Sequence, residues 1–253
     1  MTTRPEQLSI SLDDGSSVTG LLYRPAKAAR SGVTLILGHG AGANQLHPFM
    51  RLFSEGLAER GFDVLTFNFQ YMEQGRRVPD PKAKLESCYR AVIEAAINHK
   101  KLKGNRLVIG GKSMGGRIAS QVAAWDCGGS TPLSNRAAHS KSKSKSQVAP
   151  SSTDIAGLVF LGYPLHPPGR PDKLRDAHLP QITSLMLFVQ GSRDAFGSPD
   201  ELRATIKKHH LPATLHIVEG GDHSLKVSKG GSTTQVQIYE NVLDHIAAWL
   251  VSS

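Results

Sequence analysis

Cysteine is scarce in this chain of 253 residues, which contains only Cys88 and Cys127. They do not form a CxxC pair, and two cysteines are too few for the disulfide network that stabilises many small secreted domains. We therefore expect both thiols to be free. Long apolar runs are also absent: stretches such as residues 32–38 and 185–189 fall far short of the roughly 20 residues that a helix needs to cross a bilayer. No transmembrane helix is expected.

Signals for export and for metal binding are absent as well. Residues 1–7 lack the apolar core and the small-residue cleavage site of a secretory signal peptide, which predicts a cytoplasmic protein. The 11 histidines show no HExxH motif or comparable ligand spacing, so we predict no metal and no other cofactor.

Positive charge is in excess, with a formal net charge of +9 at pH 7. Such a charge would favour binding to nucleic acid or to another acidic surface. However, one Ser/Lys-rich segment without acidic residues, 128–153, holds four of the positive charges: Arg136, Lys141, Lys143 and Lys145. We predict that this segment is a disordered insertion. A solvated loop is the simpler interpretation, and a weak docking tail for an acidic partner is the alternative.

Short apolar runs alternate with amphipathic helical patterns along the rest of the chain. A period-two pattern around Asp13-Asp14-Gly15 predicts a β-hairpin, residues 8–12 and 18–23, at one edge of a sheet. Further buried strands are predicted at residues 33–37, 64–67, 107–109, 155–161, 185–189 and 215–218. Helices are predicted at residues 48–60, 82–99, 114–125, 199–208 and 234–251. In the second helix we expect the solvent side to carry Glu86, Arg90 and Glu94.

This alternation predicts an α/β fold with a mostly parallel central sheet and crossover helices on both faces. We predict a single domain over residues 1–253. The helix before the insertion and the strand after it meet at the amino-terminal edge of the sheet. The insertion should therefore lie away from the carboxyl ends of the strands, where ligands bind in such folds.

The clearest motif lies between the predicted strand 107–109 and the helix 114–125. It reads Gly111-Lys112-Ser113-Met114-Gly115-Gly116. This matches G-x-S-x-G, in which the glycines permit a tight strand-to-helix turn that exposes the serine hydroxyl. The same letters resemble the end of a phosphate-binding P-loop, but Arg106 stands where that motif needs its first glycine. We therefore predict that Ser113 is a nucleophile. The pattern assigns no role to Lys112.

A serine needs a base and an orienting acid to act as a nucleophile. Asp194 follows the predicted strand 185–189, and His223 follows the strand 215–218. Both are therefore expected at the carboxyl edge of the sheet, beside Ser113, and the chain order Ser, Asp, His is one in which such triads occur. Asp222 is the alternative acid, but a residue adjacent to the histidine has difficulty reaching its Nδ1 while Nε2 faces the serine.

A glycine-rich turn, residues 38–44, closes the strand 33–37. We predict that the backbone N–H groups of Ala41 and Met114 form an oxyanion hole, in which each donor contributes on the order of 3 kcal/mol of transition-state stabilisation. His39 lies in the same turn. A structural role is the simpler interpretation of this histidine, and a substrate contact is the alternative.

Two tyrosines follow strands at the same edge. Tyr71 comes after the strand 64–67, and Tyr163 comes after the strand 155–161. Both are candidate substrate contacts, and for Tyr163 structural packing within a proline-rich loop is an equally good interpretation. The segment 162–181, where a lid would stand, is short and rich in proline, so we predict an open site without a large cap domain.

Together these motifs resemble the α/β-hydrolase superfamily over essentially the whole chain except the insertion. They are similar to its dienelactone-hydrolase-related subgroup, shared with the hydrolase-like domain of a nonspecific-lethal chromatin-complex subunit. The segments that carry the resemblance are residues 38–42, 111–117, 162–169 and 190–194. The resemblance implies a triad on Ser113, Asp194 and His223. Dienelactone hydrolases themselves use a cysteine nucleophile, so the serine argues against dienelactone as the substrate.

The predicted activity is cleavage of a carboxylic ester or related acyl bond in a small molecule, through an acyl-enzyme on Ser113. A peptidase or a thioesterase would use the same triad and differ only in the leaving group. A catalytically silent binding scaffold is the alternative outside enzymes, with the insertion as its docking segment.

Overall fold

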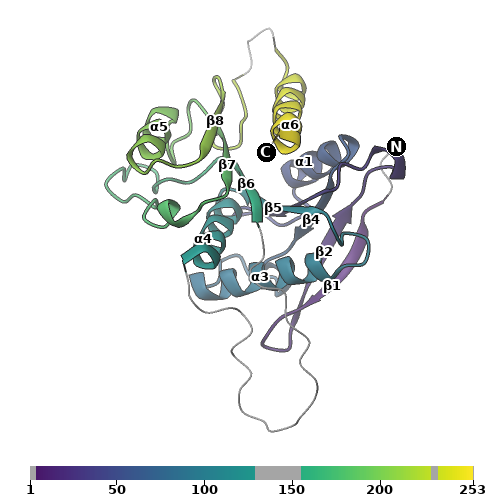
Figure 1. The fold of residues 1–253 in the computed structure, drawn as a ribbon. Coiled ribbons are helices and arrows are strands. Elements are labelled where there is room, and N and C mark those ends of the chain that lie inside the picture. Colours follow the sequence, from purple (N-terminus) through teal and green to yellow (C-terminus); the bar gives the residue numbers. More distant parts are fainter. Residues whose placement is uncertain (1–3, 129–154, 229–232, 253) are drawn as a thin grey trace.

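The computed structural model describes residues 4–128, 155–228 and 233–252, which contribute to one eight-stranded sheet covered by helices (Figure 1). The strand order is β1-β2-β4-β3-β5-β6-β7-β8. The pairs β1–β2 and β2–β4 are antiparallel, and all other neighbours are parallel. The predicted α/β class with a mostly parallel sheet is therefore confirmed.

All the predicted strands are present. The hairpin consists of β1 (Glu6–Ser11) and β2 (Ser17–Tyr23), and β1 lies at the sheet edge as expected. The other strands are β3 (Val33–Gly38), β4 (Asp63–Phe67), β5 (Arg106–Lys112), β6 (Ile155–Leu161), β7 (Leu185–Gly191) and β8 (Ala213–Val218). Strand β5 ends later than predicted because Gly110, Gly111 and Lys112 still pair with β6. It therefore continues to the residue before Ser113.

The predicted helices are also present. They are α1 (Pro48–Glu59), α3 (Lys82–Asn98), α4 (Met114–Gly128), α5 (Pro199–Lys208) and α6 (Gln235–Ser252). A proline stands in the first turn of α1 and of α5, and α5 begins with a capping box between Ser198 and Glu201. Three short elements were not predicted, because each is too short to show a period: α2 (Gln70–Glu73), η1 (Lys27–Ala29) and η3 (Leu179–Gln181).

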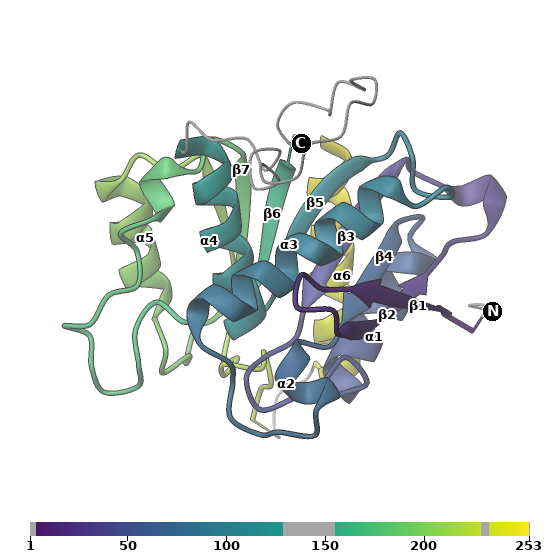
Figure 2. The ribbon, with the colours of Figure 1, turned by 90° about the horizontal axis from the view of Figure 1, so that it is seen from below.

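The helices cover both faces of the sheet (Figures 1 and 2). Helices α1 and α6 pack on one face, and α3, α4 and α5 on the other, each over its own apolar core. Because α3 contacts α4 as well as the sheet, its solvent side is narrower than predicted. Glu86 is only 7% exposed and lies 3.2 Å from Lys82, so its predicted position on the solvent side was wrong.

The parallel strands end at a common edge. Gly38, Lys112, Gly191 and Val218 are the last residues of β3, β5, β7 and β8, and residues 162–184, which join β6 to β7, contain only the short η3 turn. Between β6 and β7 the described residues therefore form no large cap, as predicted. The predicted insertion, residues 128–153, lies outside the described residues except for Gly128. The prediction that it docks to an acidic partner therefore also concerns residues that are not described.

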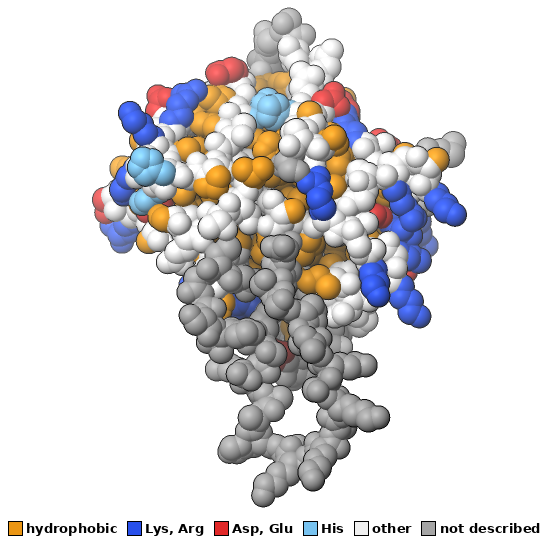
Figure 3. Space-filling view, viewed as in Figure 1, with side chains coloured by type: hydrophobic (Ala, Val, Ile, Leu, Met, Phe, Trp, Pro, Cys, Tyr) orange, Lys and Arg blue, Asp and Glu red, His pale blue; other side chains and the backbone are white. Residues whose placement is uncertain are grey.

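On the face drawn in Figure 3, charged side chains gather toward the left and the right of the view, and each group contains both basic (Lys, Arg) and acidic (Asp, Glu) residues. Hydrophobic side chains are exposed between these charged regions. Among the helices that the structure describes, none is both long enough and apolar enough to span a membrane.

Tyr89 of α3 joins two strands beneath the edge at which Ser113 lies. Its buried hydroxyl lies 2.7 Å from the carbonyl oxygen of Gly110 and 3.0 Å from that of Ile36, and it accepts the Gly110 N–H at 3.1 Å. Loss of a buried hydrogen-bonding group leaves its partners unsatisfied.

We expect Tyr89→Phe to lower the free energy of unfolding by about 1–2 kcal/mol, measured by urea denaturation. Tyr239→Phe is the control, because its half-buried hydroxyl donates a single bond of 3.2 Å to the Ser224 carbonyl. An equal loss in both variants would contradict the special role of the Tyr89 hydroxyl.

Candidate active site

Ser113 lies in a strained turn between β5 and α4. Its φ of 51° is in the left-handed region, which residues other than glycine seldom adopt. The turn is tight because α4 begins against the end of β3: a Cβ atom on Gly115 would lie 2.1 Å from the Gly38 carbonyl oxygen. Only glycine permits this approach, and the result is a serine hydroxyl held at the sheet edge.

Histidine and carboxylate side chains lie beside this hydroxyl. The Nε2 atom of His223 is 2.8 Å from Ser113 Oγ, and its Nδ1 atom is 2.8 Å and 3.0 Å from the two carboxylate oxygens of Asp194. The structure thus brings together all three residues predicted from the sequence, although 110 positions separate Ser113 from His223. The Asp194 side chain is fully buried, whereas His223 is 21% exposed at the surface of the site.

Asp194 is held by two further donors. Gln190 Nε2 donates to Oδ2 and the Phe196 N–H donates to Oδ1, both at 2.8 Å. The Phe196 ring also stacks on the His223 imidazole, with ring centroids 4.1 Å apart. The rival acid Asp222 instead accepts the N–H groups of Ser224 and Lys226, which closes its own turn.

Lys112, to which the sequence assigned no role, is buried under the base. Its Nζ donates to the backbone carbonyl oxygen of His223 at 2.5 Å and lies 5.8 Å from the centre of the Phe49 ring. Burial lowers the pKa of Lys112 to about 8, against the opposing influence of Asp194 and Asp222. A residue next to the serine is therefore bonded to the loop that carries the histidine.

The two predicted oxyanion donors line the same pocket as Ser113. Met114 is the first residue of α4, where helix amides have no acceptor within the helix. The Ala41 N–H makes no hydrogen bond to the described residues, while the Ala41 carbonyl accepts the Tyr71 hydroxyl at 2.9 Å. Tyr71 therefore orients the peptide unit that follows Ala41, and both N–H groups remain free for a ligand.

His39 fixes this turn to its neighbour. Its Nδ1 donates to the Gly40 carbonyl at 2.8 Å, and its Nε2 accepts the Phe69 N–H at 3.1 Å, which defines the tautomer. Burial lowers its pKa from 6.5 to about 4, although the bond to Gly40 opposes the shift. The imidazole is therefore neutral near pH 7, and its role is structural.

The structure buries all three candidate substrate contacts, which favours the structural alternative that was given for His39. His39 and Tyr71 are 0% exposed and Tyr163 is 1% exposed. The Tyr163 hydroxyl lies 3.2 Å from the Arg175 carbonyl oxygen, to which it donates. Aromatic residues after a strand were expected to face the pocket, but here their rings fill the core below it. They support the site and have no surface with which to touch a substrate.

A pocket of about 310 Å³ opens over Ser113. Apolar and charged side chains line it together: Ala41, Pro79, Asp80, Lys82, Leu85, Met114, Arg117, Pro164, Arg175 and Phe196. In the described part of the chain, no three His, Cys, Asp or Glu side chains are grouped as a metal site would require.

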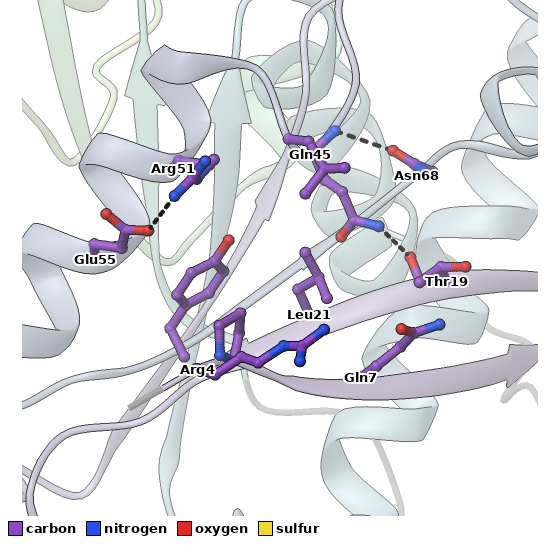
Figure 4. A pocket seen from close by; sticks show the side chains of 11 residues that line it. Arg4, Gln7, Thr19, Leu21, Gln45, Arg51, Glu55 and Asn68 are labelled. Carbon is purple, nitrogen blue, oxygen red and sulfur yellow. Dashed lines mark hydrogen bonds and ion pairs between the residues drawn. The ribbon is translucent and has the colours of Figure 1, made fainter. Parts of the chain in front are cut away.

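A larger cavity, of about 650 Å³, lies on another part of the molecule (Figure 4). It is bordered by Arg4 and the β-hairpin on one side and by α1 on the other, where Arg51 lies 3.4 Å from Glu55. None of the predicted catalytic residues lines it. We therefore assign the candidate active site by its chemistry, not by cavity volume.

Comparison with known proteins agrees with this geometry. A family profile described as an alpha/beta hydrolase domain matches residues 31–251. The chain belongs to the α/β-hydrolase family. The quorum-quenching protein AidA of Acinetobacter baumannii (strain MDR-ZJ06) is 33% identical over 111 residues, 42% of this chain and 35% of that protein. The chain thus spans about a third of the length of this curated relative.

Solved structures share the α/β-hydrolase fold along their whole length. A dienelactone hydrolase from Anabaena variabilis superposes with a TM-score of 0.69 at 17% identity, covering 99% of both chains. A serine hydrolase without lid from Xanthomonas campestris gives 0.69 at 16% identity, covering 99% of this chain and 97% of that one. A serine hydrolase homologue from Coxiella burnetii gives 0.66 at 18% identity, covering 98% and 96%. At these identities the likeness shows the fold. The likeness to a chromatin-complex subunit stays a prediction.

Several site residues of this α/β-hydrolase were missed by sequence reasoning. Gln190 is the penultimate residue of the apolar strand β7, where a buried polar residue signals a structural task, but its partner Asp194 could be found only from the fold. Phe196 and Arg175 carry no local signal, because each reaches the site through packing of distant segments, whereas Arg117 lies one helical turn beyond Ser113 and was given no role of its own.

Stability should depend on pH through His39. Because its pKa is lower in the folded state than in the unfolded chain, the unfolded state binds more protons between pH 6.5 and about 4. Stability contributed by the neutral imidazole is therefore lost as pH falls through that window. We expect the drop in unfolding free energy from pH 7 to pH 5 to be about 2 kcal/mol smaller in His39→Asn than in the wild type.

Urea denaturation at each pH measures this difference. His210→Asn is the control, because His210 is exposed and its φ of 49° suits asparagine. A pH dependence in His39→Asn as steep as that of the wild type would rule out His39 as the titrating group.

Proposed function

We propose that this protein is a serine esterase that hydrolyses carboxylic esters of small molecules at Ser113. The observation that carries the proposal is the continuous set of contacts from Ser113 Oγ through His223 to Asp194, each of 2.8 Å at its shortest. This distance falls within the range required for proton transfer between a nucleophile and its base.

His223 acts as the general base. Its Nδ1–H donates to Asp194, which leaves Nε2 free to accept the Ser113 proton. The serine oxygen attacks the ester carbonyl, and the imidazolium then donates its proton to the departing alcohol. A water molecule, deprotonated by the same Nε2, releases the acyl group and restores the serine.

Asp194 keeps the imidazole in this tautomer and stabilises its charged form. The burial of the carboxylate strengthens that interaction, because the local dielectric constant is low and water cannot compete. Gln190 and the Phe196 amide donate to the same carboxylate, so its orientation is fixed before substrate arrives.

The Ala41 and Met114 amides stabilise the oxyanion of the tetrahedral intermediate. Their availability in the pocket supports the assignment, as does the hydrogen bond from Tyr71 that orients the turn after Ala41. Each donor contributes on the order of 3 kcal/mol when it meets charge that develops only in the transition state.

Substrate size follows from the pocket. About 310 Å³ accommodates a short acyl group with a small alcohol, and residues 162–184 contribute no helical cap that would cover a long lipid chain. A thioester or peptide would undergo the same chemistry with a different leaving group, so both belong in the substrate panel.

Labelling with a fluorophosphonate probe tests the nucleophile directly. We expect one adduct, located on Ser113 by mass spectrometry, and no adduct in Ser113→Ala. Turnover of short-chain esters should disappear with the adduct. Labelling at another residue, or esterase activity that persists in folded Ser113→Ala, would refute the proposal.

A pair of matched substitutions tests the acid. Asp194→Asn should reduce kcat by about 10⁴-fold, because an amide favours the wrong histidine tautomer. Asp222→Asn should have little effect, because the Asp222 side chain only accepts backbone amides in its own turn. Equal losses in the two variants would show that the assignment of the acid is wrong.

A further inference from the structure

Two arginines without carboxylate partners line the pocket that contains Ser113. Arg117 Nε is buried and has no hydrogen-bond partner, and neither the Arg117 nor the Arg175 guanidinium forms an ion pair or hydrogen bond with a described residue. Arg117 lies one helical turn beyond the serine, since its N–H donates to the Ser113 carbonyl at 3.0 Å. Arg175 comes from the segment between β6 and β7.

The other charged residues of this pocket do have partners. Asp80 is bonded to Arg76 at 2.5 Å, and Lys82 lies 3.2 Å from Glu86. Within each pair the positive charge of one side chain offsets the negative charge of the other. The two unpaired guanidinium groups therefore leave the pocket with an excess of positive charge beside the nucleophile.

Such an arrangement is unfavourable for the protein alone. Burial and the neighbouring Arg175 both lower the pKa of Arg117, although an arginine keeps its charge at neutral pH. Like charges close together repel, and a buried donor without an acceptor destabilises the fold. A bound anion would remove both penalties, because it supplies an acceptor and opposite charge at the same point.

We propose that Arg117 and Arg175 form a carboxylate-binding subsite, so that the preferred substrates are short esters carrying a second, ionised carboxyl group. This inference rests on the proposed function. A guanidinium group presents a planar fork of donors that matches a carboxylate. Asp80, whose Oδ2 has no hydrogen-bond partner, lines the same pocket and favours a singly charged group over a doubly charged phosphate.

The position of the arginines limits the length of the substrate. Residues four apart on a helix lie about 6 Å from each other, so the carboxylate must stand only a few bonds from the ester carbonyl held at Ser113. The small pocket imposes the same limit. Monoesters of short dicarboxylic acids meet both conditions.

Two esters of equal acyl length test the subsite. Monomethyl glutarate ends in a carboxylate, and methyl valerate ends in a methyl group. We expect the wild type to favour monomethyl glutarate at least tenfold in kcat/KM, and rising salt to reduce this preference because it screens charge. The preference should fall about tenfold in Arg117→Gln and in Arg175→Gln, as expected for loss of a charge-assisted hydrogen bond, and recover in part in Arg117→Lys.

Arg170→Gln is the matched control. Arg170 belongs to the same segment as Arg175, but it is 54% exposed, lies 3.5 Å from Asp172 and does not line the pocket. The substrate preference should be unchanged in this variant. A wild type that does not distinguish the two esters, or a preference that survives both glutamine substitutions, would overturn the subsite. If Arg117→Gln fails to fold by circular dichroism, Arg175→Gln decides.

Calorimetry separates this inference from the proposed function. Ser113→Ala protein should bind monomethyl glutarate more tightly than methyl valerate, and the difference should disappear in Ser113→Ala/Arg117→Gln. Binding of this kind in a protein that hydrolyses neither ester would support the subsite and contradict the esterase proposal. If Ser113→Ala binds the two esters equally while the wild type hydrolyses neutral esters, the esterase proposal is supported and the carboxylate subsite is contradicted.

Discussion

The site at the sheet edge depends on the close contact of two backbones, where the first turn of α4 meets the last residue of β3. A Cβ atom on Gly111 or Gly115 would lie 2.2 or 2.1 Å from the Gly38 carbonyl oxygen, so no larger side chain fits at either position. This contact permits the turn that holds Ser113 at a φ of 51°. It also brings the amide of Met114 next to the turn that contains Ala41, which is why the proposed nucleophile and oxyanion donors share one pocket.

The proposed base His223 and the proposed acid Asp194 reach this point through a second set of backbone contacts. The loops after β7 and β8 are bonded to each other, from Arg193 N–H to the Gly221 carbonyl at 2.8 Å and from Ser192 N–H to the Val218 carbonyl at 3.0 Å. Lys112, the last residue of β5 before Ser113, then bonds through its side chain to the loop that carries His223. The separations within the triad are therefore fixed by the scaffold, with little freedom left to the side chains.

Some buried polar groups near the site are satisfied within the fold, and others line the pocket without a partner. His39, Tyr71 and Gln190 find their partners within the protein and hold the walls of the pocket. Arg117 and Asp80 keep buried atoms without partners beside the nucleophile. Unsatisfied groups are unfavourable in a folded interior, so these two mark where a ligand could gain binding free energy in this pocket, although other such atoms, as in Arg24, Arg90 and His99, lie outside it.

Local patterns determined the strand and helix order and the serine turn, and they pointed to the three residues of the proposed triad, because apolar periodicity and glycine positions act over a few neighbouring residues. Topology then followed, since strands alternating with helices form a parallel sheet whose carboxyl ends meet. Only the tertiary structure decided the surroundings of those residues: that Tyr71 and Tyr163 are buried, that Lys112 supports His223, and that Arg117 and Arg175 face one pocket. These outcomes depend on contacts between segments far apart in the chain, and no local pattern records which distant group will occupy a given space.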